Sequence, residues 1–355
     1  MQTWLRLFRA AGVEVSELGF LRAANLGVTP KDVLRLKRHE VVPEAAIWRG
    51  GPIRKQLEKL APDVVVIQTA RSFRPEIAAG PWLTILDLVD RLSMSYAHRA
   101  SLSSGPKSAL HSVLSRTHRS FEANAWRFVP NVVVAGRTDA EFLGVTWVPN
   151  LIERSKRPQS MATKPFDVLF FGTLNYLPNV EALRFLAEAD TAANGLSVLI
   201  AGHGPTDEVK AICRNNGWVL VEDYPSNEWL AEQANVALAP LQSTSGIQNK
   251  VLEAGAMGLA QIVSPAALAG VQGDFPAVVV ENPTQLVREI KRLTTDDDAR
   301  RLLADDAWAF THAHFTTEGW VSTLWDLLTA SSDVMTEAGA PANRSGIQEG
   351  RDRFR

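Results

Sequence analysis

The stretch STSGIQNKVLEAGAMG, at residues 243–258, places a loop of small residues directly before a lysine and a carboxylate. The Ser-x-x-Gln spacing from Ser245 to Gln248 predicts a capping box, and therefore a helix that begins near Gly246. The first amides of a helix have no intrahelical partners, so they suit a bound phosphate. The glycine would also allow the phosphate to approach the backbone closely.

Lys250 would lie one turn inside this helix, and Glu253 would follow three residues later on the same face. A lysine that reaches a diphosphate and a carboxylate that accepts hydrogen bonds from ribose hydroxyls would form a nucleotide clamp. The same spacing also fits an ordinary surface helix with a Lys–Glu pair, and spacing alone does not separate the two interpretations.

Strand-like and helix-like segments alternate around this stretch. Over 166–330, short apolar runs precede helical segments of about 8–12 residues, which predicts right-handed βαβ units and a parallel sheet. Residues 1–152 alternate in the same way but less regularly, and the polar segment 153–165, with two prolines, is interpreted as the interdomain linker. Residues 331–355 lose the apolar pattern and are predicted to be a disordered tail.

The predicted fold class is therefore α/β, with two Rossmann-like doubly wound domains that face a cleft, where ligands bind at the carboxyl ends of the strands. The first domain is expected to lack its opening strand and Gly-rich loop, because a helical segment, TWLRLFRAA at 3–11, comes first. The apolar residues of this segment, beside Arg6 and Arg9, would suit either a domain helix or a membrane surface.

Composition excludes several classes of protein. With 46% hydrophobic and 21% charged residues the chain is globular, and its single cysteine, Cys213, excludes a disulfide scaffold and a cysteine-cluster metal site. No apolar run approaches the roughly 18 residues of a membrane span, so a cytoplasmic protein is expected.

Residues 1–150 have a net charge of +7 and the remainder −9. Such a basic first domain could bind the anionic inner face of a membrane, a phosphorylated substrate or the acidic second half of the chain. Alternatively, the difference could be ordinary variation in surface charge. Nucleic acid is not expected as a partner.

Several segments resemble a known family in sequence and in order. They are FFGTLNYLPNVEAL at 170–183, AGHGP at 201–205, VEDYPS at 221–226 and GIQNKVLEAGAMGLAQIVSP at 246–265. The chain resembles the retaining family-4, or group 1, glycosyltransferases of the GT-B fold. Within that family it is most similar to sugar transferases of bacterial exopolysaccharide systems.

The resemblance implies a role for each matching residue. Gly246 and the neighbouring amides of Ser245 and Ile247 would hold the donor diphosphate, Lys250 would neutralise it as it leaves, and Glu253 would bind the ribose. Other donor-side residues lie at the ends of two strands. Those implied to lie near the diphosphate or sugar are Gly172, Thr173 and Asn175, and those implied to lie beside the base are Asp223 and Tyr224. His203 lies in a loop expected to face the cleft. These enzymes are usually metal-independent, which implies no metal site and no cofactor besides the nucleotide-diphosphate sugar co-substrate.

The acceptor side is less well defined. Many family members have a glutamate eight residues before the Glu253 position, where this chain has Ser245. Arg71 and Arg74, after the strand-like VVVIQT, could contact an anionic acceptor or lie in a solvated loop. Asp90 could act with Asp87 as an acid–base pair, or could simply pair with its neighbouring arginine or cap a helix.

The function implied is transfer of a hexosyl unit, with retention, from a nucleotide-diphosphate sugar to a glycan, lipid-linked or small-molecule acceptor in bacterial polysaccharide or glycoconjugate synthesis. The alternative is a catalytically inactive subunit that binds a nucleotide sugar and partners another transferase. A GT-B sugar-nucleotide epimerase would need acid–base carboxylates or histidines across the cleft, and the sequence shows no convincing set.

Overall fold

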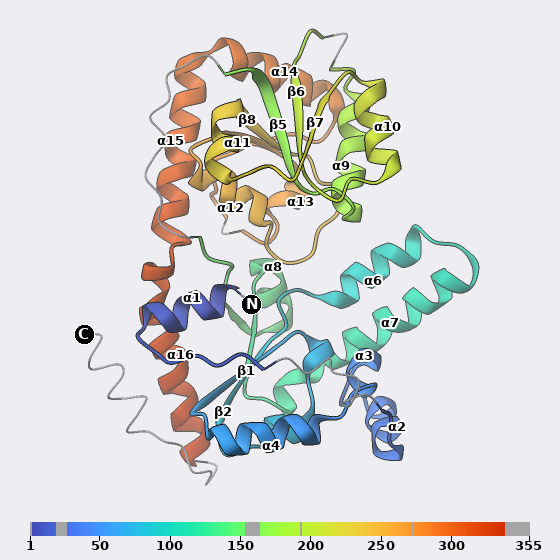
Figure 1. The fold of residues 1–355 in the computed structure, drawn as a ribbon, viewed down its shortest axis with the longest axis vertical. Helices are drawn as coiled ribbons and strands as arrows, with labels where there is room; N and C mark the ends of the chain where they lie inside the picture. Colours follow the sequence, from blue (N-terminus) through green and yellow to red (C-terminus); the bar gives the residue numbers. More distant parts are fainter. Residues whose placement is uncertain (1, 19–26, 153–163, 192–193, 272, 338–355) are drawn as a thin grey trace. The chain divides into compact units, whose positions relative to one another are not determined.

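The computed structural model of the chain forms two compact units (Figure 1): unit 1 consists of Met1–Pro149 and Thr317–Arg355, and unit 2 of Asn150–Thr316. The residues that the structure describes are 2–18, 27–152, 164–191, 194–271 and 273–337. Most of the predicted linker and the segment 338–355 of the predicted tail lie outside the described residues.

A parallel sheet with the strand order β1-β2-β3-β4 forms the centre of unit 1. Its strands are β1 (Val64–Gln68), β2 (Leu83–Asp87), β3 (Asn131–Val134) and β4 (Thr146–Trp147). The helices of this unit are α1 (Gln2–Ala10), α2 (Pro30–Lys37), α3 (Pro43–Ala46), α4 (Gly50–Leu60), α5 (Pro75–Ala78), α6 (Leu92–Ser101), α7 (Gly105–Asn124), α8 (Arg137–Leu143) and α16 (Thr317–Glu337), with 3-10 turns η2 (Ala70–Ser72) and η3 (Ala125–Arg127).

The last helix, α16, packs against α1 and β2 of unit 1. Its apolar face is buried there, with Val321, Leu324 and Leu328 at most 3% exposed. The sequence had placed this helix in the second domain, 166–330, and a disordered tail from residue 331. The structure instead assigns the helix to unit 1 and continues it to Glu337.

A parallel sheet of six strands, in the order β10-β9-β8-β5-β6-β7, forms the centre of unit 2. The strands are β5 (Phe166–Thr173), β6 (Val198–His203), β7 (Val219–Glu222), β8 (Ala234–Ala239), β9 (Ala260–Val263) and β10 (Val278–Val279). The helices are α9 (Leu177–Glu188), α10 (Asp207–Asn215), α11 (Asn227–Gln233), α12 (Asn249–Ala256), α13 (Pro265–Leu268), α14 (Pro283–Thr295) and α15 (Asp297–His314).

Local sequence signals account for many of these elements. The middle of β5 consists of apolar residues that are buried on both faces, as in a central parallel strand. Helix α10 begins where the Thr206 side chain accepts from the amide of Val209, and α14 begins with Pro283 after the capping residue Asn282. The predicted α/β class with two parallel-sheet, Rossmann-like domains is confirmed. No helix in the described ranges combines the length and apolar character needed to cross a membrane.

Strand order locates the binding edge of unit 2. From β5 the chain proceeds outward through β6 and β7, then returns to the other side of β5 for β8, β9 and β10. The direction of winding therefore reverses between β5 and β8. In open parallel sheets, ligands bind outside the carboxyl ends of the strands at such a reversal.

Candidate functional site

Lys250 lies buried at the carboxyl end of β5. Its Nζ donates a hydrogen bond to Oδ1 of Asn179 (2.6 Å) and lies 4.0 Å from the centre of the Phe170 ring. The Asn179 Nδ2 in turn donates to the carbonyl of Thr173 (2.7 Å), the last residue of β5. Gly172 has a φ of +136°, and a Cβ there would lie 3.5 Å from the Lys250 Nζ. The lysine is thus fixed beside a backbone that carries no side chain.

Burial lowers the pKa of Lys250 to about 7, and the nearby Glu253 carboxylate only partly counteracts this effect. In the parts of the chain that the structure describes, its direct polar partner is the neutral amide of Asn179. A positive charge at this position is therefore poorly compensated. An anion that reaches Nζ would raise the pKa again and would be held by a charge-assisted hydrogen bond.

Helix α12, which carries Lys250, begins later than the sequence predicted. It starts at Asn249, and its N-cap residue Gln248 makes no side-chain cap hydrogen bond. The predicted capping box is wrong, because Gly246 has a φ of +66°, through which a right-handed helix does not pass. The Gln248 Nε2 instead donates to the carbonyl of Ser245 (3.3 Å).

The residues predicted to open the helix therefore lie in a loop between β8 and α12. They are Ser245, Gly246 and Ile247. This loop packs tightly against Gly270, since a Cβ at Gly270 would lie 2.0 Å from the Gly246 carbonyl oxygen.

A glycine on α12 sets how closely this helix packs against α15. A Cβ at Gly255 would lie 2.2 Å from Oγ1 of Thr311, which is on α15. A side chain at this position would require at least the Thr311 side chain to move, and the Ala307 carbonyl oxygen would lie 3.2 Å from the Cβ. The helix that carries Lys250 and Glu253 therefore packs closely against α15.

A second group of polar side chains follows β6 and β7. The His203 Nδ1 lies 2.5 Å from Oδ1 of Asp223, and the His203 ring stacks on that of Tyr224, with centroids 5.7 Å apart. Both His203 and Asp223 are largely exposed, at 61% and 76% of their side chains. Burial, with a smaller contribution from the Glu253 carboxylate, raises the pKa of Tyr224. Glu253 therefore acts electrostatically on this group as well as on Lys250.

Close packing joins the two groups. A Cβ at Gly202 would lie 1.8 Å from the carbonyl oxygen of Gly172, so the ends of β5 and β6 approach as only glycine permits. The amide of Leu174 donates to the His203 carbonyl (2.8 Å), and the Asn175 side chain lies against Gly204.

The structure thus brings most predicted donor-side residues to one edge of the unit 2 sheet: Gly172, Thr173, Asn175, His203, Asp223, Tyr224, Lys250 and Glu253. Sequence reasoning missed Asn179 and Phe170, which hold Lys250.

On unit 1, Arg71 belongs to a polar cluster. Its Nη2 donates to the Tyr96 hydroxyl (3.2 Å), and its Nε lies 3.5 Å from the Glu44 carboxylate. Burial raises the pKa of Glu44, but hydrogen bonds from His118 and Tyr96 outweigh this effect and lower it to about 2. The Arg71 side chain remains 44% exposed. It can therefore meet a ligand in an orientation fixed by Tyr96 and Glu44.

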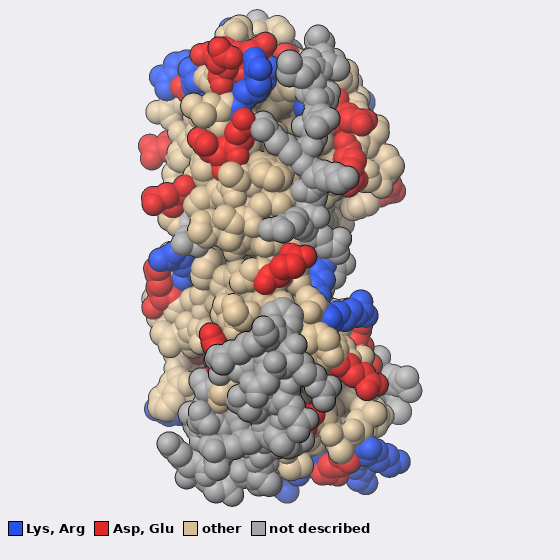
Figure 2. Space-filling model, turned by 90° about the vertical axis from the view of Figure 1, so that its left-hand side faces the viewer, with Lys and Arg blue, Asp and Glu red and all other residues tan. Residues whose placement is uncertain are grey.

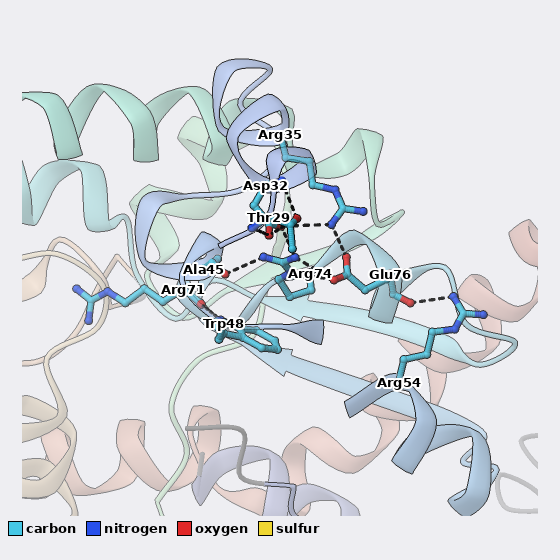
Figure 3. A network of polar contacts seen from close by, with 9 residues as sticks. All are labelled: Thr29, Asp32, Arg35, Ala45, Trp48, Arg54, Arg71, Arg74 and Glu76. Atoms are coloured by element: carbon cyan, nitrogen blue, oxygen red, sulfur yellow. Dashed lines mark hydrogen bonds and ion pairs between the residues drawn. The ribbon is translucent and has the colours of Figure 1, made fainter. Parts of the chain in front are cut away.

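Arg74 differs from Arg71 and does not line an open surface. Its side chain is 3% exposed, pairs with Asp32 and Glu76, and donates to the carbonyl of Ala45. In Figure 3 the Arg71 side chain points away from this network. The expectation that Arg74 could contact an anionic acceptor is therefore wrong, because its charge is already compensated inside the unit.

Asp87 supports the ends of β1 and β2. Its carboxylate, 7% exposed, accepts hydrogen bonds from Trp4 Nε1, Gln68 Nε2 and the amide of Val89. Burial raises the pKa of Asp87. Thr69 and Val89 have φ values of +67° and +66°, a strain of about 1–3 kcal/mol for each such residue. Asp87 thus holds two strained strand ends and offers no exposed carboxylate for an acid–base pair.

Asp90 follows this strained turn and is partly buried. Its expected neighbour Arg91 lies 3.6 Å from the Asp139 carboxylate and stacks over the Phe142 ring at 3.7 Å. Within the described ranges, no group of three or more histidine, cysteine, aspartate or glutamate side chains is arranged to hold a metal ion.

Comparison with known proteins relates unit 2 to a known family. Residues 165–296 match the family described as "Glycosyl transferases group 1". The matched segment lies in unit 2, covers somewhat more than a third of the chain and includes all of the predicted donor-side residues named above. No curated protein sequence matches the chain.

Several solved structures share the fold of most of the chain. TarM superposes with a TM-score of 0.61 at 12% identity, over 78% of this chain and 57% of TarM. The chain thus spans less than two thirds of TarM. HepE of Anabaena, in complex with UDP, gives 0.59 at 12% identity, over 79% of this chain and 82% of HepE. Sucrose-phosphate synthase of Thermosynechococcus elongatus gives 0.61 at 14% identity, over 85% and 81%. At these identities the similarity shows the GT-B fold.

Proposed function

We propose that the protein transfers a hexosyl unit from a nucleotide-diphosphate sugar to a glycan, lipid-linked or small-molecule acceptor, with retention of configuration. The observation that carries this proposal is the buried Lys250 ammonium beside Gly172, at the strand-order reversal of a group 1 glycosyltransferase domain. The proposed setting is bacterial polysaccharide or glycoconjugate synthesis in the cytoplasm, at the inner face of the membrane.

In the proposed mechanism the protein stabilises the leaving diphosphate. The acceptor hydroxyl attacks the anomeric carbon on the face from which the diphosphate departs. The new C–O bond forms as the old one breaks, and a diphosphate oxygen takes the hydroxyl proton. The Lys250 ammonium neutralises the charge that develops on the diphosphate, so a metal ion is not required. No cofactor other than the sugar nucleotide takes part.

The roles proposed for other residues follow the family resemblance. Glu253 binds the ribose, and the base lies beside Asp223 and Tyr224. UDP is the first nucleotide to test, because the solved structure of HepE contains it. On unit 1, Arg71 and Asp90 are proposed to face the acceptor.

A nucleotide-release assay tests the reaction. The full chain, incubated with UDP-sugars or GDP-sugars and a panel of candidate acceptors, is expected to release nucleotide faster when an acceptor is present. The absence of a carboxylate at Ser245 favours a second candidate, an inactive subunit that binds the sugar nucleotide. That candidate predicts donor binding but no acceptor-dependent release.

Replacing Glu253 by glutamine is expected to weaken binding of a nucleoside diphosphate more than binding of inorganic diphosphate. The carboxylate is partly buried and acts electrostatically on Tyr224, beside which the base is proposed to lie, and inorganic diphosphate has no ribose hydroxyls. Calorimetric titration with both ligands measures the difference. Glu188→Gln, at an exposed position on α9, is the control. Equal losses for the two ligands would assign Glu253 a structural role instead.

A further inference from the structure

Helices α6 and α7 form an antiparallel hairpin that extends from the sheet of unit 1 (Figure 1). The Ser108 hydroxyl donates to the carbonyl of Ala100 near the turn, and the Ser115 hydroxyl donates to that of Ser93 at the base (both 2.9 Å). Between these contacts the Tyr96 ring packs against His118, with centroids 5.2 Å apart. The inner face of the hairpin is therefore tied together by specific contacts, and its outer face is presented on a defined scaffold.

Every exposed lysine, arginine, aspartate or glutamate residue of the hairpin is basic. From Leu92 to Phe121 the sequence contains no aspartate or glutamate. Its four basic residues are all exposed: Arg99, Lys107, Arg116 and Arg119. By contrast, lysine, arginine, aspartate and glutamate side chains are interspersed on the face of the molecule drawn in Figure 2. The hairpin is thus a locally basic surface on a chain whose net charge is −2.

Aliphatic side chains are exposed among these basic residues. Met94, Leu102, Leu110 and Val113 are 42%, 54%, 57% and 54% exposed. Leu102 and Lys107 flank the turn of the hairpin. Leu110, Val113, Arg116 and Arg119 follow one another at three-residue intervals along α7, so each lies beside the next in a row that winds around the helix from apolar to basic residues. These eight residues are called the hairpin surface below.

We infer that the hairpin surface binds a membrane surface that contains anionic lipid. Basic side chains would meet lipid phosphates, and the aliphatic ones would enter the boundary between headgroups and acyl chains. A lipid surface fits better than an acidic protein, because the aliphatic residues are dispersed over two helices and their turn. A protein partner would favour a compact apolar centre with aromatic anchors. This inference does not rest on the proposed transferase function, since vesicle binding is measured without substrate.

Co-sedimentation of the full chain with vesicles tests the inference. We expect binding to vesicles of phosphatidylcholine mixed with phosphatidylglycerol, and little binding to phosphatidylcholine alone. Binding is expected to fall as salt is added, because salt screens contacts between exposed charges and lipid. Lys107→Glu with Arg116→Glu is expected to lower the partition coefficient at least about tenfold. Leu102→Ser with Leu110→Ser is expected to lower it more moderately, at every salt concentration.

Matched control variants separate this surface from general electrostatics. Lys55→Glu with Lys59→Glu changes the net charge by the same amount, at exposed positions on α4 of the same unit. Leu302→Ser removes an exposed leucine (65%) from α15. Both controls should retain vesicle binding. Equal loss in the α4 variant, or no binding of the wild-type chain to anionic vesicles, would overturn the inference. Circular dichroism verifies that each variant is folded.

Discussion

Replacing Lys250 by methionine is expected to weaken binding of UDP or GDP at least about tenfold, because a charge-assisted hydrogen bond contributes about 1.5–3 kcal/mol. The substitution should change the stability of unit 2 much less. Methionine removes an ammonium whose burial already lowers its pKa to about 7. The cost is the lost hydrogen bond to Asn179. Calorimetric titration measures the affinity, and thermal unfolding measures the stability.

A second Lys–Asn pair in the same unit provides the control. The Lys291 Nζ donates to Oδ1 of Asn194 (2.8 Å), but this lysine is exposed on α14, away from the carboxyl ends of the strands. Lys291→Met should leave nucleotide affinity unchanged. If the two methionine variants bind nucleotide equally well, Lys250 does not hold the diphosphate.

Replacing Asp32 by alanine is expected to destabilise unit 1 by about 3–5 kcal/mol, because it leaves a buried arginine without its closest counter-charge. Asp32 and Arg74 are 1% and 3% exposed at their side chains, and Asp32 also accepts hydrogen bonds from Thr29 (Figure 3). Burial alone would raise the pKa of Asp32, but the hydrogen bonds from Thr29 and Arg74 outweigh this effect. The pKa of Asp32 is therefore lower than its ordinary value. Glu76, which is more exposed, compensates Arg74 only in part.

Amide hydrogen exchange measures this effect within unit 1 alone. A thermal or denaturant unfolding curve of the whole chain would combine the stabilities of the two units. The peptides of β1 and β2 should lose protection in the Asp32→Ala variant. Glu58→Ala is the control, since the exposed Arg54–Glu58 pair should contribute less than about 1 kcal/mol. Equal changes in the two variants would show that the buried network is not a main source of stability.

The sequence predicted unit 2 well because its central strands, β5, β6 and β8, are short apolar runs that are mostly buried. A glycine or proline lies at or just after the end of each of these strands. It did not predict α15. The residues that this helix buries include Ala304, Ala307 and Thr311, and small or polar residues give no clear hydrophobic period. The start of α12 was misplaced for another reason: Gly246 has a positive φ and packs against Gly270, a contact that the local sequence pattern does not reveal.

The acceptor side shows a further limit of sequence reasoning. Arg71 and Arg74 look equivalent in the sequence, since both flank the same short segment after β1. Their environments differ because Asp32, 42 residues earlier, pairs with Arg74, whereas Arg71 reaches Tyr96 on α6. Side-chain burial of this kind depends on which distant elements meet, and local pattern does not specify it.

Proton uptake on nucleotide binding tests most directly whether Lys250 meets the diphosphate. Free Lys250 has a pKa of about 7, and an adjacent anion raises it, so binding above pH 7 draws a proton onto the lysine. The phosphate itself, with a second pKa of about 6, is already ionised there. Calorimetry near pH 8.5 in buffers of different ionisation enthalpy should show uptake of about one proton by the wild-type chain and none by Lys250→Met. Affinity should also fall as the pH rises above about 7. Absence of uptake, or equal uptake by the methionine variant, would contradict the assignment of the donor site to Lys250.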